Sequence, residues 1–142
     1  IIRTIHPQLP CDFLVGWTRE PAISSVLINQ VKAKISSIFL IQTQEEVLRL
    51  EKALLVGEKE IVKQSLEKVS CLLLQLSPAI YNEKLRALKR SSRGLDCMAK
   101  SSGAGGGDCG IALSFDSEAS QILVERWQAA GIEVLYKERW DR

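Results

Sequence analysis

The sequence KSSGAGGGDCG occupies residues 100–110 and runs directly into the apolar segment IALSF, residues 111–115. Five of the nine glycines of the chain fall in this stretch. Glycine adopts backbone angles closed to other residues and lets a ligand approach the main chain, so N–H groups can converge there on an anion. A run of Gly and Ser is also typical of a flexible hinge. Because a strand-like segment and a capped helix follow at once, we expect an ordered phosphate-binding loop.

The composition predicts one domain that binds a small anion. The chain has 142 residues, of which 46% are hydrophobic, and this is enough for a core. Nineteen Lys and Arg against 17 Asp and Glu leave a net charge of +2, well below the excess expected of a nucleic-acid binder. No apolar run reaches the roughly 20 residues of a membrane span, so no membrane partner is predicted either.

The four cysteines predict neither a metal site nor a disulfide framework. They lack the close pairs of a zinc site and the density of a disulfide scaffold. We therefore expect reduced thiols in a cytoplasmic protein.

One strand and four helices are predicted before the weak strand that leads into the loop. Residues 11–18 are rich in strand formers and precede Pro21. A Thr-x-x-Glu capping pattern begins at Thr43, and glycines at 57 and 94 are suited to end helices. Apolar periodicity and these signals predict helices over residues 24–37, 44–56, 58–76 and 79–93, followed by a weak strand over 95–99.

The outer face of the helix predicted at 79–93 is strongly basic. Its cationic residues are Lys84, Arg86, Lys89, Arg90 and Arg93. The usual meaning of such a cluster is a solvated face. A docking face for an acidic partner or for a neighbouring domain is the alternative.

The segments after the loop complete an α+β fold. Residues 110–115 predict a strand, Asp116 is a suitable N-cap for a helix over 117–130, and residues 132–136 predict a closing strand. This order fits a ferredoxin-like arrangement of about four mainly antiparallel strands with helices packed on one face. We expect the domain to span residues 11–142, with residues 1–10 a tail or the end of an earlier element.

The glycine-rich stretch resembles a known motif. Residues 100–113, KSSGAGGGDCGIAL, are similar to the third conserved motif of the GHMP kinases, in the form found in bacterial phosphomevalonate kinases. The segment CDFLVGWTRE at 11–20 and the ending GIEVLY at 131–136 resemble the same family. The resemblance covers nearly the whole chain and corresponds to the C-terminal domain of these enzymes.

The resemblance implies transfer of the ATP γ-phosphoryl group to 5-phosphomevalonate, which yields 5-diphosphomevalonate and ADP in the mevalonate route to isoprenoids, with Mg²⁺ as the metal. It also implies a missing N-terminal domain that carries its own ATP phosphate loop and the catalytic Lys and Asp. No catalytic residue is therefore expected in this chain, and the chain alone is expected to be inactive.

The same resemblance gives the candidate site residues. Backbone N–H groups of the loop are expected to meet phosphate, and the candidates are Ser102, Gly103, Ala104, Gly105 and Gly106, with Lys100 and Ser101 beside them. Lys100 either neutralises phosphate charge or is an ordinary polar end to a strand. Asp108 is expected to orient the loop, because a free carboxylate facing phosphates is repulsive unless a metal lies between them. Cys109 is expected to be a buried small residue at a strand start.

Two alternatives remain open at this point. The chain could be the C-terminal half of another GHMP enzyme, such as mevalonate kinase or diphosphomevalonate decarboxylase. It could also be a stand-alone ferredoxin-like ligand-binding module. An apolar surface where another domain docks would favour the half-enzyme over the module.

Overall fold

A four-stranded antiparallel sheet lies between two groups of helices. The computed structural model describes residues 4–20, 29, 32–76, 82–102 and 109–140. Neighbouring strands pair in the order β2-β3-β1-β4, and every pair is antiparallel. The α+β prediction is thereby confirmed. The strands are β1 (Cys11–Trp17), β2 (Cys97–Ser101), β3 (Cys109–Ser114) and β4 (Glu133–Trp140), and the helices are α2 (Ser37–Val56), α3 (Lys59–Leu76), α4 (Glu83–Arg90) and α5 (Ser117–Ala129).

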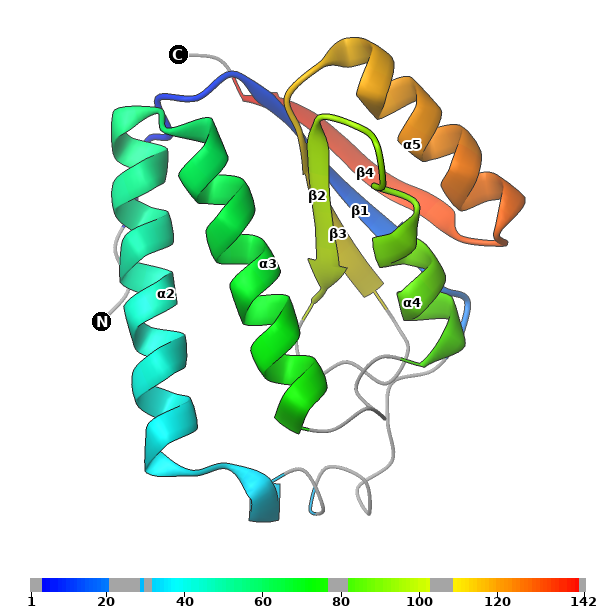
Figure 1. Cartoon of the computed structure of the whole chain (residues 1–142). Helices are drawn as coiled ribbons and strands as arrows, with labels where there is room; N and C mark the ends of the chain where they lie inside the picture. Colours follow the sequence, from blue (N-terminus) through cyan, green and yellow to red (C-terminus); the bar gives the residue numbers. More distant parts are fainter. Residues whose placement is uncertain (1–3, 21–28, 30–31, 77–81, 103–108, 141–142) are drawn as a thin grey trace.

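The sheet contributes to two hydrophobic clusters, because successive side chains of a strand point to opposite faces. Ala112 of β3 joins a cluster with residues of α4 and α5, among them Leu85 and Trp127. Leu113, the next residue, joins a second cluster with Leu54 of α2 and residues of α3. Helices therefore contact both faces of the sheet, not one face as predicted: α4 and α5 pack on one face, and α2 and α3 pack on the other. Figure 1 shows α3 beside the edge strand β2 and α5 beside β4.

The indole of Trp127 anchors α5 and α4 to β1. This side chain is completely buried, and its Nε1 donates a hydrogen bond to the carbonyl of Leu88 in α4 at 3.1 Å. On β1 the ring lies against Gly16, where an added Cβ would come within 2.8 Å of a ring carbon. The glycine therefore makes room for the tryptophan that holds these three elements together.

Helix α2 begins earlier than the sequence predicts. Its N-cap is Ser36, whose side chain accepts a hydrogen bond from the N–H of Phe39 at 3.1 Å. The prediction of a helix start at Thr43 is wrong, because Thr43 lies inside the continuous helix. A capping box forms only where the preceding chain leaves the helix, and extending an existing helix costs less than starting a new one. The predicted end at Gly57 is confirmed by its φ of 77°.

The remaining boundaries follow the predictions with three changes. Helices α3 and α5 are confirmed, and Asp116 caps α5. Helix α4 is shorter than predicted and begins after Asn82. Strand β2 extends through Ser101, and β4 extends to Trp140, because pairing with neighbouring strands sets their length.

Two further predictions concern the beginning of the chain. Half of the helix predicted at 24–37 lies outside the described residues. In the described part, residues 29 and 32–34 are helical, and the chain leaves the helix at Ile35 and Ser36. Leu9, in the predicted tail, is buried, and the N–H of Gln8 donates to the carbonyl of Leu54 in α2 at 2.8 Å. In the described ranges, no helix has the length and apolar character needed to cross a membrane.

Candidate functional site at the glycine-loop end of the sheet

The glycine loop leaves and re-enters the sheet at the end where β1 also finishes. Ser101, the last residue of β2, pairs with Gly110 of β3, and Trp17, the last residue of β1, pairs with Cys109. The N–H of Ser102 donates to the carbonyl of Cys109 at 3.1 Å. The antiparallel pair β2–β3 therefore fixes both ends of the loop on a rigid support.

The predicted phosphate-binding residues divide by their place in this structure. Lys100 and Ser101 belong to β2 itself, so they support the loop from within the sheet, and Ser101 is fully buried. Ser102 is exposed just beyond the strand. The other candidates lie outside the described residues: Gly103, Ala104, Gly105, Gly106 and Asp108.

The side chain of Lys100 turns back onto the strand end. Its Nζ donates a hydrogen bond to the carbonyl of Ser101. Burial lowers the pKa of this ammonium group below its ordinary value of 10.5, because the charged form loses hydration. The structure therefore places a partly desolvated cation at the beginning of the loop.

Gly110, the last glycine of the motif, has a packing role. An added Cβ at this position would lie 2.6 Å from a methyl group of Leu88 and 3.0 Å from the carbonyl oxygen of Lys100. Leu88 is completely buried. Helix α4 therefore rests directly on the strand at the base of the loop, and a larger residue at 110 would push it away.

A polar contact that the sequence reasoning missed ties the end of β1 to the start of α4. Asn82 caps α4 by accepting a hydrogen bond from the N–H of Leu85 at 2.9 Å. Its Nδ2 donates to Glu20 Oε2 at 3.0 Å. The available signal was an Asn directly before an acidic first turn, which is typical of a helix N-terminus. The contact with Glu20, 62 residues away in sequence, leaves no local signal.

No metal site is apparent within the described part of the chain, where no three His, Cys, Asp or Glu residues are grouped to hold an ion. The four cysteines are free thiols. Burial raises the pKa of Cys11 and of Cys97 to about 11, so both thiols stay protonated near neutral pH. Cys109, expected to be a buried small residue, is partly buried at the first position of β3.

The chain is similar to phosphomevalonate kinases from two bacteria. It is 50% identical to the enzyme of Streptococcus pneumoniae, with a TM-score of 0.96 and coverage of 98% of this chain and 43% of that one. A structure of the same enzyme in complex with phosphomevalonate and AMPPNP matches with a TM-score of 0.94. The phosphomevalonate kinase of Streptomyces sp. (strain CL190) is 30% identical over 131 residues, which cover 83% of this chain and 35% of that enzyme.

These relatives are longer proteins, and the chain spans less than half of their length. The family model described as "GHMP kinases C terminal" matches residues 50–133. The matched region contains α3, α4 and α5 completely, together with β2, the glycine loop and β3. The chain belongs to the GHMP kinase C-terminal family.

Proposed function

We propose that this chain supplies the C-terminal half of the active site of a phosphomevalonate kinase. The reaction transfers the γ-phosphoryl group of ATP to the phosphate of 5-phosphomevalonate and yields 5-diphosphomevalonate and ADP. The observation that carries the proposal is the 50% identity, over 98% of the chain, to an enzyme solved with phosphomevalonate and AMPPNP. We place this kinase in the cytoplasm, in keeping with the free thiols of the chain.

The reaction needs positioning more than it needs a base. The acceptor is a phosphate oxygen that is already anionic near neutral pH, so abstraction of a proton contributes little. The larger barrier is the repulsion between two polyanions, which cations and backbone N–H groups reduce. A loop with several consecutive glycines on a rigid two-strand support is suited to that task.

Within the proposal, the loop residues Gly103, Ala104, Gly105 and Gly106 turn their N–H groups toward phosphate. Ser102 offers its side-chain hydroxyl, because its N–H donates to the carbonyl of Cys109. Lys100 and Ser101 act from the end of β2, where Lys100 offers a desolvated cation that an arriving phosphate would stabilise. Asp108 orients the loop. Bound Mg²⁺ would supply positive charge that offsets the repulsion between the phosphates. No cluster of metal ligands is found among the described residues, so none of them is assigned to this ion.

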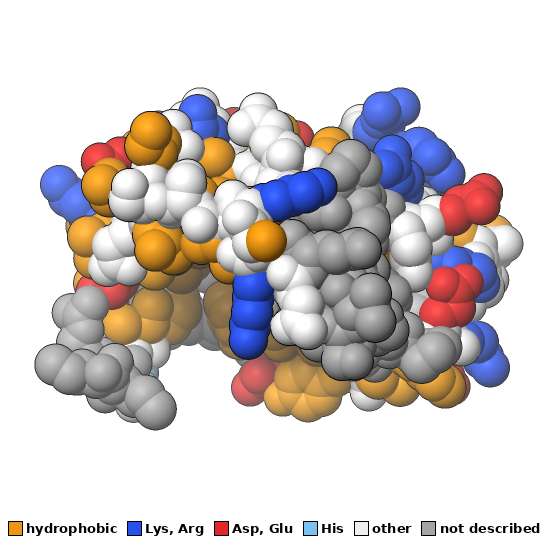
Figure 2. Space-filling view, turned by 90° about the horizontal axis from the view of Figure 1, so that it is seen from below, with side chains coloured by type: hydrophobic (Ala, Val, Ile, Leu, Met, Phe, Trp, Pro, Cys, Tyr) orange, Lys and Arg blue, Asp and Glu red, His pale blue; other side chains and the backbone are white. Residues whose placement is uncertain are grey.

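The proposal includes a preceding domain that docks on α2. Seven large apolar side chains of this helix are exposed, and Ile38 and Ile41 have exposed fractions of 67% and 58%. In the view of Figure 2, hydrophobic side chains gather on the side of the molecule that α2 occupies. An apolar surface of this kind favours a half-enzyme over a stand-alone module. The chain alone is then expected to form no ADP, because the catalytic Lys and Asp of the family belong to the other domain.

The test is substrate preference in the protein at its natural length. We expect ADP formation with 5-phosphomevalonate and at least a hundredfold lower kcat/KM with mevalonate. Ser102→Ala should lower kcat/KM with 5-phosphomevalonate by about tenfold to a hundredfold, because the hydroxyl that donates to the transferring phosphate is lost. Ser117→Ala, an exposed serine on α5, is the matched control and should leave kcat/KM within twofold. A preference for mevalonate would refute the assignment.

A further inference from the structure

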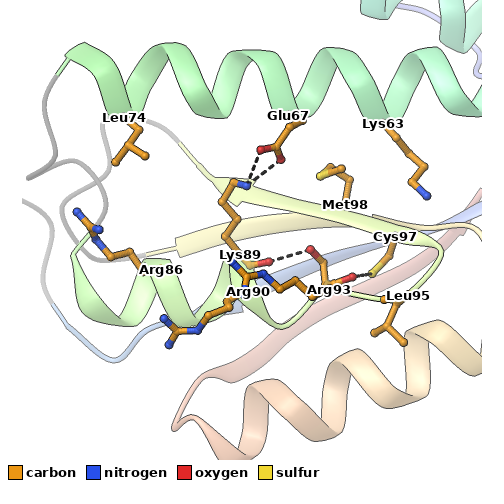
Figure 3. A pocket seen from close by; sticks show the side chains of 12 residues that line it. Lys63, Glu67, Leu74, Arg86, Lys89, Arg90, Arg93, Leu95, Cys97 and Met98 are labelled. Carbon is orange, nitrogen blue, oxygen red and sulfur yellow. Dashed lines mark hydrogen bonds and ion pairs between the residues drawn. The ribbon is translucent and has the colours of Figure 1, made fainter.

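A groove lies between α3 and α4. It has a volume of about 540 Å³ and is lined by both helices, by the turn at 92–95 and by the beginning of β2. Figure 3 shows Glu67 of α3 and Lys89 of α4 reaching toward each other across it. A volume of this size is typical of sites for small molecules. The groove is thus large enough to hold a ligand of its own.

The groove carries more positive charge than its carboxylate balances. Five cationic side chains line it, against the single carboxylate of Glu67, and they are Lys63, Arg86, Lys89, Arg90 and Arg93. Lys89 Nζ binds Glu67 Oε2 at 2.7 Å, and Lys63 Nζ binds Asp96, beside the groove, at 3.2 Å.

Arg90 and Arg93 keep their charge uncompensated. Within the part of the chain that the structure describes, the guanidinium groups of these two residues form no ion pair. Both side chains are exposed at the rim of the groove, on α4 and on the turn that follows it. A guanidinium presents several N–H donors in a planar fork that matches the oxygens of a phosphate. The two arginines are therefore suited to hold one phosphate group.

Part of the groove floor is apolar. It includes Leu95 and Met98, and Leu74 of α3, which is 40% exposed, also lines the groove. The thiol of Cys97 adds no negative charge near neutral pH, because burial raises its pKa to about 11. A ligand with an anionic group at the rim and an apolar body on the floor would match both surfaces.

We propose that the α3–α4 groove binds a small organic phosphate, with the phosphate held by Arg90 and Arg93 and the apolar part lying on Leu95 and Met98. The site is formed by elements other than the strands that hold the glycine loop, apart from the beginning of β2, and its lining includes none of the described residues of 100–110. A groove of this volume favours a small molecule over an acidic peptide, which would need an extended surface.

The test measures binding of phenyl phosphate and of orthophosphate to the natural-length protein by calorimetry at constant ionic strength. We expect saturable binding of phenyl phosphate, with a Kd at least threefold lower than that of orthophosphate. Arg90→Gln/Arg93→Gln should raise the Kd of phenyl phosphate at least tenfold. Lys32→Gln/Lys34→Gln removes the same charge at exposed positions outside the groove and should change the Kd less than twofold. Far-ultraviolet circular dichroism checks that both variants remain folded.

The position of the ligand is measured separately, by protection from phenylglyoxal, a reagent for arginine, with mass-spectrometric mapping. Phenyl phosphate should protect Arg90 and Arg93 and leave Arg49, which lies outside the groove, unprotected. Absence of saturable binding, an unchanged Kd in the arginine variant, or protection confined to other arginines would overturn the proposal. Equal affinity for phenyl phosphate and orthophosphate would contradict the proposed apolar contact. Stronger protection by a hexaglutamate peptide would assign the groove to an acidic protein partner instead. None of these readouts depends on catalysis, so they stand apart from the kinase assignment.

Discussion

At the scale of single residues, Gly16 shows how one missing side chain positions two helices. The ring of Trp127 occupies the space that a Cβ at Gly16 would take, at 2.8 Å. We expect Gly16→Ala to destabilise the protein by about 1–3 kcal/mol, because the tryptophan must shift within a packed core. Chemical denaturation measures this change. Gly94→Ala is the contrast, since no atom lies within 4 Å of an added Cβ there and the cost is limited to strain at a φ of 76°. Equal losses in both variants would contradict the packing explanation.

At the scale of elements, a pair of ion contacts holds α3 to the start of β2. Asp96 accepts hydrogen bonds from Lys59 at 2.8 Å and from Lys63 at 3.2 Å. Burial acts to raise the pKa of Asp96, but the two lysines outweigh it, and the pKa lies below its ordinary value of 3.8. Because the three side chains are partly exposed, we expect Asp96→Asn to cost only about 0.5–1.5 kcal/mol.

The pH dependence of that contribution follows from the direction of the shift. A carboxyl group with a lowered pKa in the folded state stabilises the fold fully above its unfolded value of 3.8, and the stabilisation is lost as the pH falls through the folded pKa. The difference in unfolding free energy between the parent and Asp96→Asn should therefore be constant at pH 6–7 and shrink below about pH 4. Glu45→Gln, at an exposed position of α2, should show a smaller difference. A difference that grows toward low pH would contradict this account.

The helix boundaries and contacts also show which structural features can be predicted from the sequence and which cannot. The start of α5 was predictable, because Asp116 caps it and the signal lies within one turn. The start of α2 was not, because a capping pattern at Thr43 looks the same whether or not the preceding residues are helical. The glycine loop was located by composition alone. The contact between Gly110 and Leu88 depends on how α4 packs on the sheet, and no local pattern contains that information.

At the scale of the whole molecule, the apolar surface of α2 predicts how the chain behaves inside a longer protein. Leu48 is 50% exposed. If another domain covers it, Leu48→Lys should lower the unfolding free energy of the natural-length protein by about 1.5–3 kcal/mol, since a buried leucine is lost. The same change should alter the stability of the 142-residue chain by less than about 0.5 kcal/mol.

Gln42→Lys, at an exposed polar position of the same helix, is the matched control and should leave both proteins unchanged. Differential scanning calorimetry of the two lengths gives the four comparisons. If Leu48→Lys is neutral in the longer protein, the docking of a preceding domain on this face of α2 is wrong.

The contact between Leu88 and Gly110 also bears on how such a protein can change over evolutionary time. Leu88 rests on the strand at the base of the glycine loop, and its neighbours Lys89 and Arg90 line the groove on the other side of α4. One short helix therefore serves two surfaces. A larger residue at position 110 would be tolerated only together with a smaller one at 88, and that exchange would move the wall of the groove. We expect the residues at positions 88 and 110 to change together among relatives. A sequence change at the base of the loop would then be accompanied by a change in the shape of the groove.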